Sequence, residues 1–293
     1  MPLSYPLFIV AYALSMVLGI VIALLLFVGW DQIWWRKALK SARFNLVYLT
    51  LLAALPLTTL VESALSSPDE ATDEVVYTNW MFSIGGNAIR VLQDRLDYQV
   101  VVDLSIVVYV WIFTFILYFT PILLVCLDDR LTMRKYSVAI LFNYLVLIPF
   151  YILFPVTVTG FYPDSGMTPL LYINTNWGRV VTSVDPLDND FPSGHVSIVL
   201  TTILVLMYAG WDRRGYVYFV AISLAGIVFA VLFLGVHWLA DIFGGLVLGV
   251  GATMLASNEK VQMAVDRQVR RVTTALVGEE EGGSDPARLS RGP

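Results

Sequence analysis

The chain has two histidines, His195 and His237, and the first follows Pro192-Ser193-Gly194 at the start of an apolar run. This order is typical of a helix start, because Ser193 can cap the helix, Pro192 fixes the approach of the chain and Gly194 lets a ligand come close to the backbone. Unpaired backbone N–H groups at such an end, reinforced by the helix dipole, form a site for phosphate. An interfacial histidine beside an ordinary cap explains the same residues, so the motif alone leaves both interpretations open.

The second histidine, His237, also lies in an apolar stretch, and Asp241 follows it four residues later. Positions i and i+4 of a helix share a face, so the carboxylate can accept from one ring nitrogen and leave the lone pair of the other directed outward. That pairing is the orienting half of a nucleophile or general-base arrangement. An ionisable residue in a membrane segment is costly to bury and is therefore a candidate for function. A polar pair that ties two helices together is the alternative.

The elements that must position these side chains are membrane helices. With 58% hydrophobic and 14% charged residues, the chain is too apolar for an ordinary soluble domain. Its apolar runs are unbroken rather than alternating, which predicts helices and not an outer-membrane barrel. The fold class is therefore all-α, a polytopic transmembrane helix bundle. At about 20 residues per span, seven spans are predicted: 6–29, 45–61, 101–126, 137–157, 195–211, 216–235 and 238–256.

The basic residues predict the orientation of the chain in the membrane. They gather in alternate loops, in four groups: Arg36, Lys37, Lys40 and Arg43; Arg130, Arg134 and Lys135; Arg213 and Arg214; Lys260, Arg267, Arg270 and Arg271. Such loops are cytoplasmic, so we expect the N-terminus outside, the C-terminus in the cytoplasm and the cell membrane as the location. Both histidines then lie at the outer ends of helices, at nearly the same depth, and can act on one substrate from the extracytoplasmic face.

Three parts are expected along the chain. Residues 1–44 form an N-terminal transmembrane helix and a cytoplasmic basic loop, residues 45–256 form a six-helix core, and residues 257–293 form a cytoplasmic amphipathic segment with a disordered acidic tail. Two outer loops, 62–100 and 158–194, are long enough to be functional.

A short helical pattern, the single cysteine and the distribution of basic residues allow three smaller predictions. In the first outer loop Ile89, Leu92 and Leu96 recur at helical spacing, which predicts an interfacial helix. The single cysteine, Cys126, allows no disulfide within the chain and fits a buried structural thiol. No basic patch indicates a nucleic-acid partner, and the sequence leaves the oligomeric state open.

Pro192-Ser193-Gly194-His195 followed by His237-x-x-x-Asp241 resembles the second and third signature motifs of the type 2 phosphatidic acid phosphatase superfamily of integral membrane lipid phosphatases. The order of the motifs, their helix-terminal placement and the two-helix hairpin between them also match, over roughly residues 45–256. The resemblance implies a six-helix core with one added N-terminal helix. It further implies the following roles: His237 as the nucleophile that forms a phosphohistidine, Asp241 as its orienting group, His195 as the acid for the leaving group, and Ser193 and Gly194 as phosphate ligands. No metal or other cofactor is expected, and we find no carboxylate cluster to hold one.

The chain departs from this family in its phosphate-binding cations. The family's first motif, K-x6-R-P, is missing, and the third motif has Ala230 and Val231 where Ser-Arg is usual. One possibility is that another outer cation stabilises the phosphoryl charge, and only Arg179, Arg90 and Arg95 are available for it. Arg179 lies in the loop that leads to the Pro-Ser-Gly-His motif and is the preferred candidate. A role as a solvated or headgroup-contacting arginine is the alternative.

The function predicted from the sequence is that of a membrane lipid phosphatase that removes phosphate or pyrophosphate from a lipid. Phosphatidate, phosphatidylglycerophosphate-like lipids and polyprenyl pyrophosphates all remain open as substrates. The main alternative is a headgroup phosphotransferase, because the segment from Phe150 to Pro155 resembles a helix end of inositol phosphorylceramide synthases. A catalytically inactive lipid-binding protein is a further alternative. A transporter or channel is less well supported, since few ionisable groups lie at depth.

Overall fold

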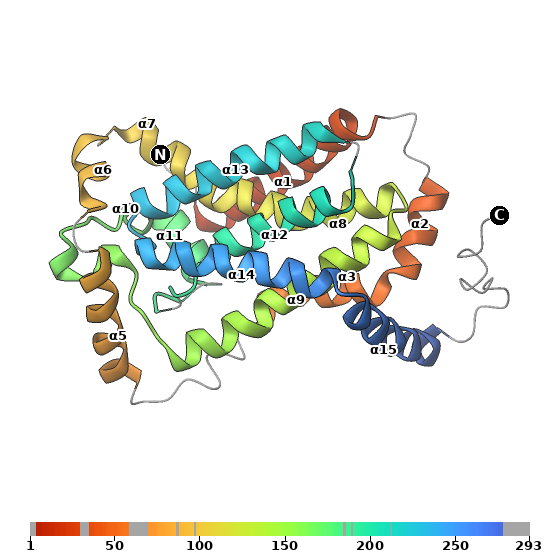
Figure 1. Cartoon of the computed structure of the whole chain (residues 1–293). Coiled ribbons are helices and arrows are strands. Elements are labelled where there is room, and N and C mark those ends of the chain that lie inside the picture. The colour runs from red at the N-terminus through yellow and green to blue at the C-terminus, as the bar shows by residue number, and fades with distance from the viewer. Residues whose placement is uncertain are drawn as a thin grey trace.

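The computed structural model describes residues 4–29, 35–58, 70–85, 88–96, 98–183, 186–188, 190–211 and 213–277. These residues form helices joined by loops, and the long helices lie roughly side by side in one bundle (Figure 1). The predicted all-α class is confirmed.

The helices of the described ranges are α1 (Tyr5–Phe27), α2 (Trp35–Phe44), α3 (Leu46–Ala53), α5 (Glu70–Gly85), α6 (Arg90–Arg95), α7 (Gln99–Ile106), α8 (Phe113–Cys126), α9 (Arg130–Leu153), α10 (Leu170–Ile173), α11 (Thr175–Thr182), α12 (Gly194–Tyr208), α13 (Arg214–Phe233), α14 (Leu239–Ser257) and α15 (Glu259–Val277). A π-helical turn, η3 (Val107–Ile112), joins α7 to α8 without a break. Short 3-10 turns are η2 (Leu55–Leu57), η4 (Thr159–Phe161) and η5 (Pro163–Ser165).

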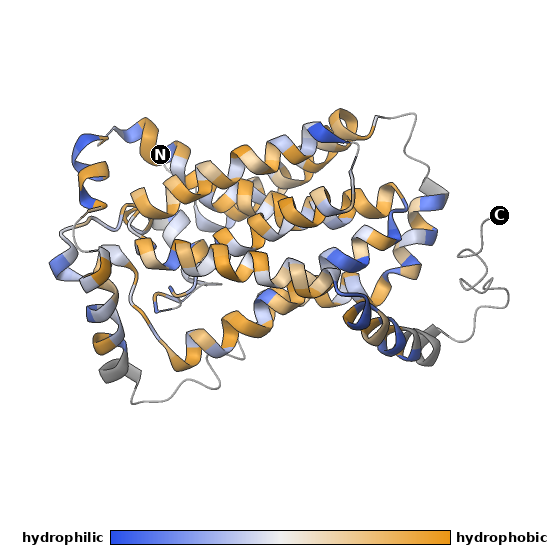
Figure 2. Ribbon diagram, viewed as in Figure 1, coloured by the Kyte–Doolittle hydropathy of each residue, from blue (hydrophilic) through white to orange (hydrophobic). Residues whose placement is uncertain are grey.

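Among the described residues, five helices are long and apolar enough to cross a membrane: α1, the continuous helix Gln99–Cys126, α9, α13 and α14. A sixth apolar helix, α12, is shorter, at 15 residues. Apolar residues dominate the length of the bundle, and hydrophilic residues gather at its two ends (Figure 2). The chain is therefore a multi-pass membrane protein, as its composition predicts.

One of the seven predicted spans, 45–61, does not form a long helix in the described part of the chain. The helix α3 ends at Ala53 and passes into the turn η2, which contains Pro56. A proline inside a helix removes a backbone hydrogen bond and clashes with the preceding turn, so the apolar run is cut short, and residues 59–61 lie outside the described residues. The prediction of a span there was wrong for the residues that are described.

The first helix packs against the rest of the bundle. The helix α1 packs against α8, and the indole N–H of Trp111 donates to the Ser15 hydroxyl at 3.0 Å. Trp111 also lies so close to Gly19 that a Cβ at that position would be 2.6 Å from its ring. The six apolar helices of the described bundle therefore include α1.

Small residues bring α12 and α14 together in the middle of the bundle. A Cβ on Gly245 would lie 2.6 Å from the Ser193 carbonyl oxygen, and one on Gly249 would lie 2.8 Å from that of Ser197. Glycines at such positions let two helix backbones approach closely. As a result, the N-terminal ends of α12 and α14 lie next to each other at one end of the bundle.

The opposite end of the bundle holds α2, α3 and α15 (Figure 1). The predicted amphipathic segment after residue 257 is confirmed as a helix, and Arg134 on α9 forms an ion pair with its Asp266. The predicted acidic tail from residue 278 lies outside the described residues. Cys126 is half-buried and free.

The described residues between 70 and 96 include the helices α5 and α6. The predicted interfacial helix near Ile89 corresponds to the short α6, with Ile89 buried at its N-cap. Within α5, Met81 is buried against Trp238, and the neighbouring Phe82 ring packs on the same indole. The helix α5 therefore covers the end of the bundle where α14 begins.

Candidate active site

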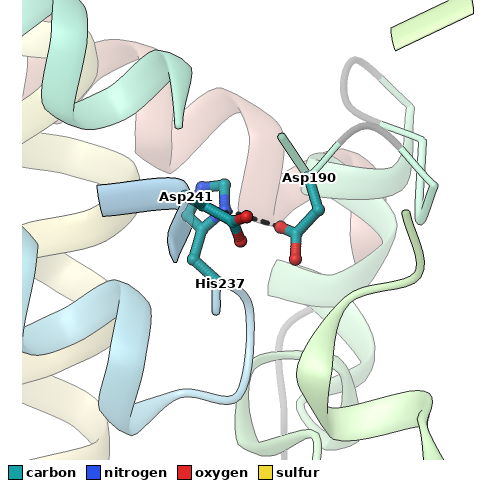
Figure 3. A group of neighbouring side chains, drawn as sticks. All are labelled: Asp190, His237 and Asp241. Carbon is teal, nitrogen blue, oxygen red and sulfur yellow. Dashed lines mark ion pairs between the residues drawn. The ribbon is translucent and has the colours of Figure 1, made fainter. Parts of the chain in front are cut away.

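Three buried side chains from separate elements meet at the N-terminal end of α14: Asp190, His237 and Asp241 (Figure 3). Asp190 lies in the loop before α12, His237 in the loop between α13 and α14, and Asp241 in the first turn of α14. The Nδ1 atom of His237 lies 2.6 Å from Oδ1 of Asp190 and 3.4 Å from Oδ2 of Asp241. Both ring nitrogens are buried without a regular hydrogen bond in the described part of the chain; Nδ1 faces the two carboxylates as an ion pair, and no such pair is found for Nε2.

An extended segment after α9 holds the two loops together. The Val156 N–H donates to the Asp188 carbonyl at 2.9 Å, and the Val158 N–H donates to the Leu187 carbonyl at 3.0 Å. A few residues further on, the same segment pairs with the His237 loop, since the Gly160 N–H donates to the Gly235 carbonyl at 2.7 Å. The loop of Asp190 and the loop of His237 are therefore fixed to one common strand-like piece of backbone.

Glycine is required where this segment meets the His237 loop. Gly235 has φ of 74°, in the left-handed region that favours glycine. After it, the N–H groups of Val236 and His237 both donate to the Val231 carbonyl at 3.1 Å. This arrangement ends α13 and turns His237 toward the site.

Asp241 has two backbone contacts besides its ion pair with His237. Its Oδ2 accepts the Trp238 N–H at 2.6 Å, which caps the start of α14. Its backbone carbonyl accepts the Ser193 N–H at 3.1 Å. Asp241 therefore ties the start of α14 to the Pro-Ser-Gly-His motif as well as lying beside the histidine.

His195 lies on an aromatic wall, across from His237. Its ring stacks on Tyr109, with ring centroids 4.2 Å apart, and contacts Phe113 at 4.1 Å. The two histidine rings have centroids 6.2 Å apart, close enough for one phosphoryl group to contact both. The structure thus brings together His195, His237 and Asp241, as the sequence predicts.

The Pro-Ser-Gly-His residues form a capped helix start. Ser193 is the N-cap of α12, and its hydroxyl accepts the Val196 N–H at 3.4 Å. The first N–H groups of a helix have no partner within it and attract anions. Tyr151 of α9 also reaches this turn, because its hydroxyl donates to the Pro192 carbonyl at 3.2 Å and would lie 3.1 Å from a Cβ on Gly194.

The pKa values of His237 and Asp190 are both raised. Burial disfavours the charged form of His237, but the carboxylates of Asp190 and Asp241 outweigh this and raise its pKa to about 10. The pKa of Asp190 is also raised, because the side chain is buried and lies beside Asp241. The cluster therefore keeps its protons to a higher pH than its members would in water.

The expectation that the chain has no carboxylate cluster was wrong. The ligand atoms of Asp190, His237 and Asp241 all lie within 4.8 Å of one another, and two carboxylates with an imidazole are groups that divalent cations accept. The 2.6 Å separation of Nδ1 and Oδ1 also fits a direct ion pair. The sequence contained the acid in Asp-Asn-Asp, but 47 positions separate Asp190 from His237, and no local spacing links them.

The predicted phosphate-binding arginine packs against an aromatic ring of α1. Arg179 is exposed on α11, and its guanidinium carbon lies 4.1 Å from the ring centroid of Tyr5 on α1. Arg90 forms an exposed ion pair with Asp94 at 3.5 Å, and Arg95 is exposed at the end of α6. Among the described residues, neither lysine nor arginine forms an ion pair with the two buried carboxylates.

Two histidines therefore lie near the starts of neighbouring helices, beside backbone N–H groups that can bind an anion, and carboxylates face His237. The family model of the PAP2 superfamily matches residues 155–259. The match spans both histidines, both aspartates and the extended segment between α9 and α12, and over these residues it supports the type 2 phosphatidic acid phosphatase superfamily predicted from the motifs. Members of this superfamily are phosphatases and phosphotransferases. No curated protein and no solved structure matches the chain.

Proposed function

We propose that the protein is a lipid phosphatase that removes a phosphate or pyrophosphate group through a phosphohistidine formed on His237. The observation that carries the proposal is the state of the His237 ring. Its Nδ1 is held by carboxylates, and its buried Nε2 has no hydrogen-bond partner in the described part of the chain. Once this ring loses its extra proton, Nδ1–H faces the carboxylates and Nε2 presents a lone pair to a substrate.

The reaction proceeds in two steps. In the first, Nε2 of His237 attacks phosphorus, the bond from phosphorus to the lipid oxygen breaks, and His195 gives its proton to that oxygen. In the second, His195 takes a proton from water, the water oxygen attacks phosphorus, and the bond to Nε2 breaks to release phosphate. The free N–H groups at the start of α12, with the Ser193 hydroxyl and the Gly194 amide, stabilise the phosphoryl oxygens.

The location of the site favours a lipid substrate. The histidines lie at the ends of apolar helices, and aromatic rings from η3 and α8 form one wall of the site. We further propose that this end of the bundle faces the extracytoplasmic side of the cell membrane, since the basic residues of α2, α15 and the loop before α13 lie at the other end. A lipid then enters from the outer leaflet.

A headgroup phosphotransferase is the second candidate. It uses the same phosphohistidine, and an alcohol takes the place of water in the second step. The observation that favours it is the contact between the Tyr151 hydroxyl and the Pro192 carbonyl. Tyr151 belongs to the segment that resembles a helix end of inositol phosphorylceramide synthases.

Both candidates are tested with purified protein, a panel of lipid phosphates and pyrophosphates, and acceptor alcohols, with His237→Ala as the control. Phosphate release that disappears in the variant supports the phosphatase, and turnover only with an acceptor supports the transferase. Equal traces for the wild type and the variant would contradict both and leave a lipid-binding protein.

A further inference from the structure

We propose that Asp190 is the positioning residue that orients His237, and that Asp241 serves mainly to build the start of α14 and to fix the Pro-Ser-Gly-His turn. This inference rests on the proposed phosphohistidine function. It assigns a role to a residue outside both sequence motifs, and it divides between two carboxylates the work that the sequence predicts for Asp241 alone.

The distances distinguish the two carboxylates. Oδ1 of Asp190 lies 2.6 Å from Nδ1 of His237, within the range of a charge-assisted contact, whereas Oδ2 of Asp241 lies 3.4 Å away, beyond it. That same Oδ2 atom accepts the Trp238 N–H at 2.6 Å. The nearer carboxylate is therefore that of Asp190, and the Asp241 oxygen that faces the ring is shared with the cap of α14.

The carboxylate of Asp190 is buried beside His237 and Asp241. The residue is 1% exposed, and apart from the ion pair neither of its oxygens has a hydrogen-bond partner in the described part of the chain. A buried carboxylate without a partner is strongly destabilising. His237 is the cation that compensates it, so the two side chains are held against each other.

The backbone around Asp190 is fixed on both sides. Before it, the Asp188 carbonyl accepts the Val156 N–H, and after it, the Ser193 N–H donates to the Asp241 carbonyl. The His237 backbone is fixed in turn by its N–H bond to the Val231 carbonyl at 3.1 Å. Positioning of this kind requires a rigid support, and the fold supplies it for both partners.

The chemical effect follows from the tautomer. A carboxylate accepts the proton of Nδ1, keeps the lone pair on Nε2 and stabilises the cationic ring of the phosphohistidine. An asparagine at position 190 can instead donate to Nδ1 and place the proton on Nε2, where it blocks attack. In the serine proteases the corresponding change lowers kcat by about 10⁴-fold. We expect Asp190→Asn to lower kcat by about 10³- to 10⁴-fold with little change in KM.

Two variants serve as comparisons. Asp241→Asn keeps an oxygen for the Trp238 N–H, so the cap survives while the charge is lost, and we expect kcat to fall by about tenfold or less. Asp94→Asn removes an exposed outer acid whose ion pair with Arg90 is at 3.5 Å, and it controls for net charge. Asp190→Glu restores the carboxylate, and it should recover part of the lost kcat.

The pH profile adds a readout that a merely structural role would not change. The titratable groups that face His237 are Asp190, Asp241 and His195. Attack requires the neutral ring, so kcat/KM rises as His237 loses its proton. Removing the Asp190 charge lowers the pKa of His237, and we expect the acid limb to move to lower pH by about 1 to 3 pH units. An unmoved limb in Asp190→Asn would contradict the proposal.

A spectroscopic test separates this inference from the proposed function. The chain has only two histidines, so protein labelled with ¹⁵N at histidine gives two sets of imidazole signals, and His195→Gln assigns them. We expect the His237 signals to titrate at lower pH and to change tautomer in Asp190→Asn, and to change less in Asp241→Asn. A larger change in Asp241→Asn would overturn the inference, whether or not the protein shows phosphatase activity. The expected spectra without any turnover would reject the phosphatase alone.

Discussion

The contact between Gly245 of α14 and the Ser193 carbonyl controls the position of the Pro-Ser-Gly-His turn. A Cβ at position 245 would lie 3.1 Å from Cβ of Val196 and 2.6 Å from that carbonyl oxygen. The distance to the oxygen is roughly 0.8 Å shorter than the 3.4 Å at which ordinary contact begins. The nearer atom is backbone and cannot turn aside as a flexible side chain would. Gly245→Ala must therefore move the start of α12 away from α14.

The size of the effect follows from this displacement. Overpacking of a close contact costs about 1 to 3 kcal/mol, and alanine returns up to about 1 kcal/mol over glycine inside a helix. We expect a net destabilisation of about 0 to 3 kcal/mol. The effect on catalysis should be larger, because a misplacement of about 1 Å can lower the rate about 100-fold. The turn carries His195 and the N–H groups for the phosphate, so kcat should fall by about 10- to 100-fold.

Two glycines of the same helix provide matched controls. Gly251 has nothing within 4 Å of the position of a Cβ, so Gly251→Ala should keep wild-type kcat and thermal stability. A Cβ on Gly249 would lie 2.8 Å from the Ser197 carbonyl oxygen, one turn deeper in the bundle. Gly249→Ala should lower stability as Gly245→Ala does, with a smaller loss of kcat.

The assay is lipid phosphate hydrolysis in detergent, with the thermal unfolding midpoint measured on the same samples. If Gly245→Ala and Gly251→Ala match the wild type in both measurements, the close contact does not position the turn, and the explanation of the glycine is refuted.

Other substitutions test the remaining parts of the site. His195→Gln should slow turnover of lipid substrates by about 10²- to 10⁴-fold and slow p-nitrophenyl phosphate much less, since its leaving group needs no proton; equal losses on both substrates would argue against an acid role. Tyr151→Phe removes the hydroxyl that donates to the Pro192 carbonyl, and we expect up to about a tenfold loss of kcat, about what one weak neutral hydrogen bond contributes, measured in the same assay. Arg179→Ala should keep kcat/KM within about twofold, because the guanidinium lies over the Tyr5 ring; a clear rise in KM would restore the phosphate-binding role predicted from the sequence.

Local patterns in the sequence were enough to predict the membrane bundle and the part of the site formed by His195, His237 and Asp241. Long apolar runs predict spanning helices because burial in lipid depends on the run itself. Ser193 before an apolar run predicts a helix cap, and the four-residue spacing of His237 and Asp241 places both at one helix start. These features depend on neighbouring residues, so a single sequence reveals them, and the family motifs are built from the same local signals.

The other half of the site depended on contacts between distant segments. Asp190 reaches His237 because the segment from Val156 to Gly160 pairs with the loops of both residues, and no spacing in the sequence encodes that pairing. Similarly, the apolar run at 45–61 contains Pro56, whose effect depends on where the helix packs. A buried ion pair between loops is stable only when both backbones are fixed by others, so the tertiary structure alone decided which carboxylate lies against His237.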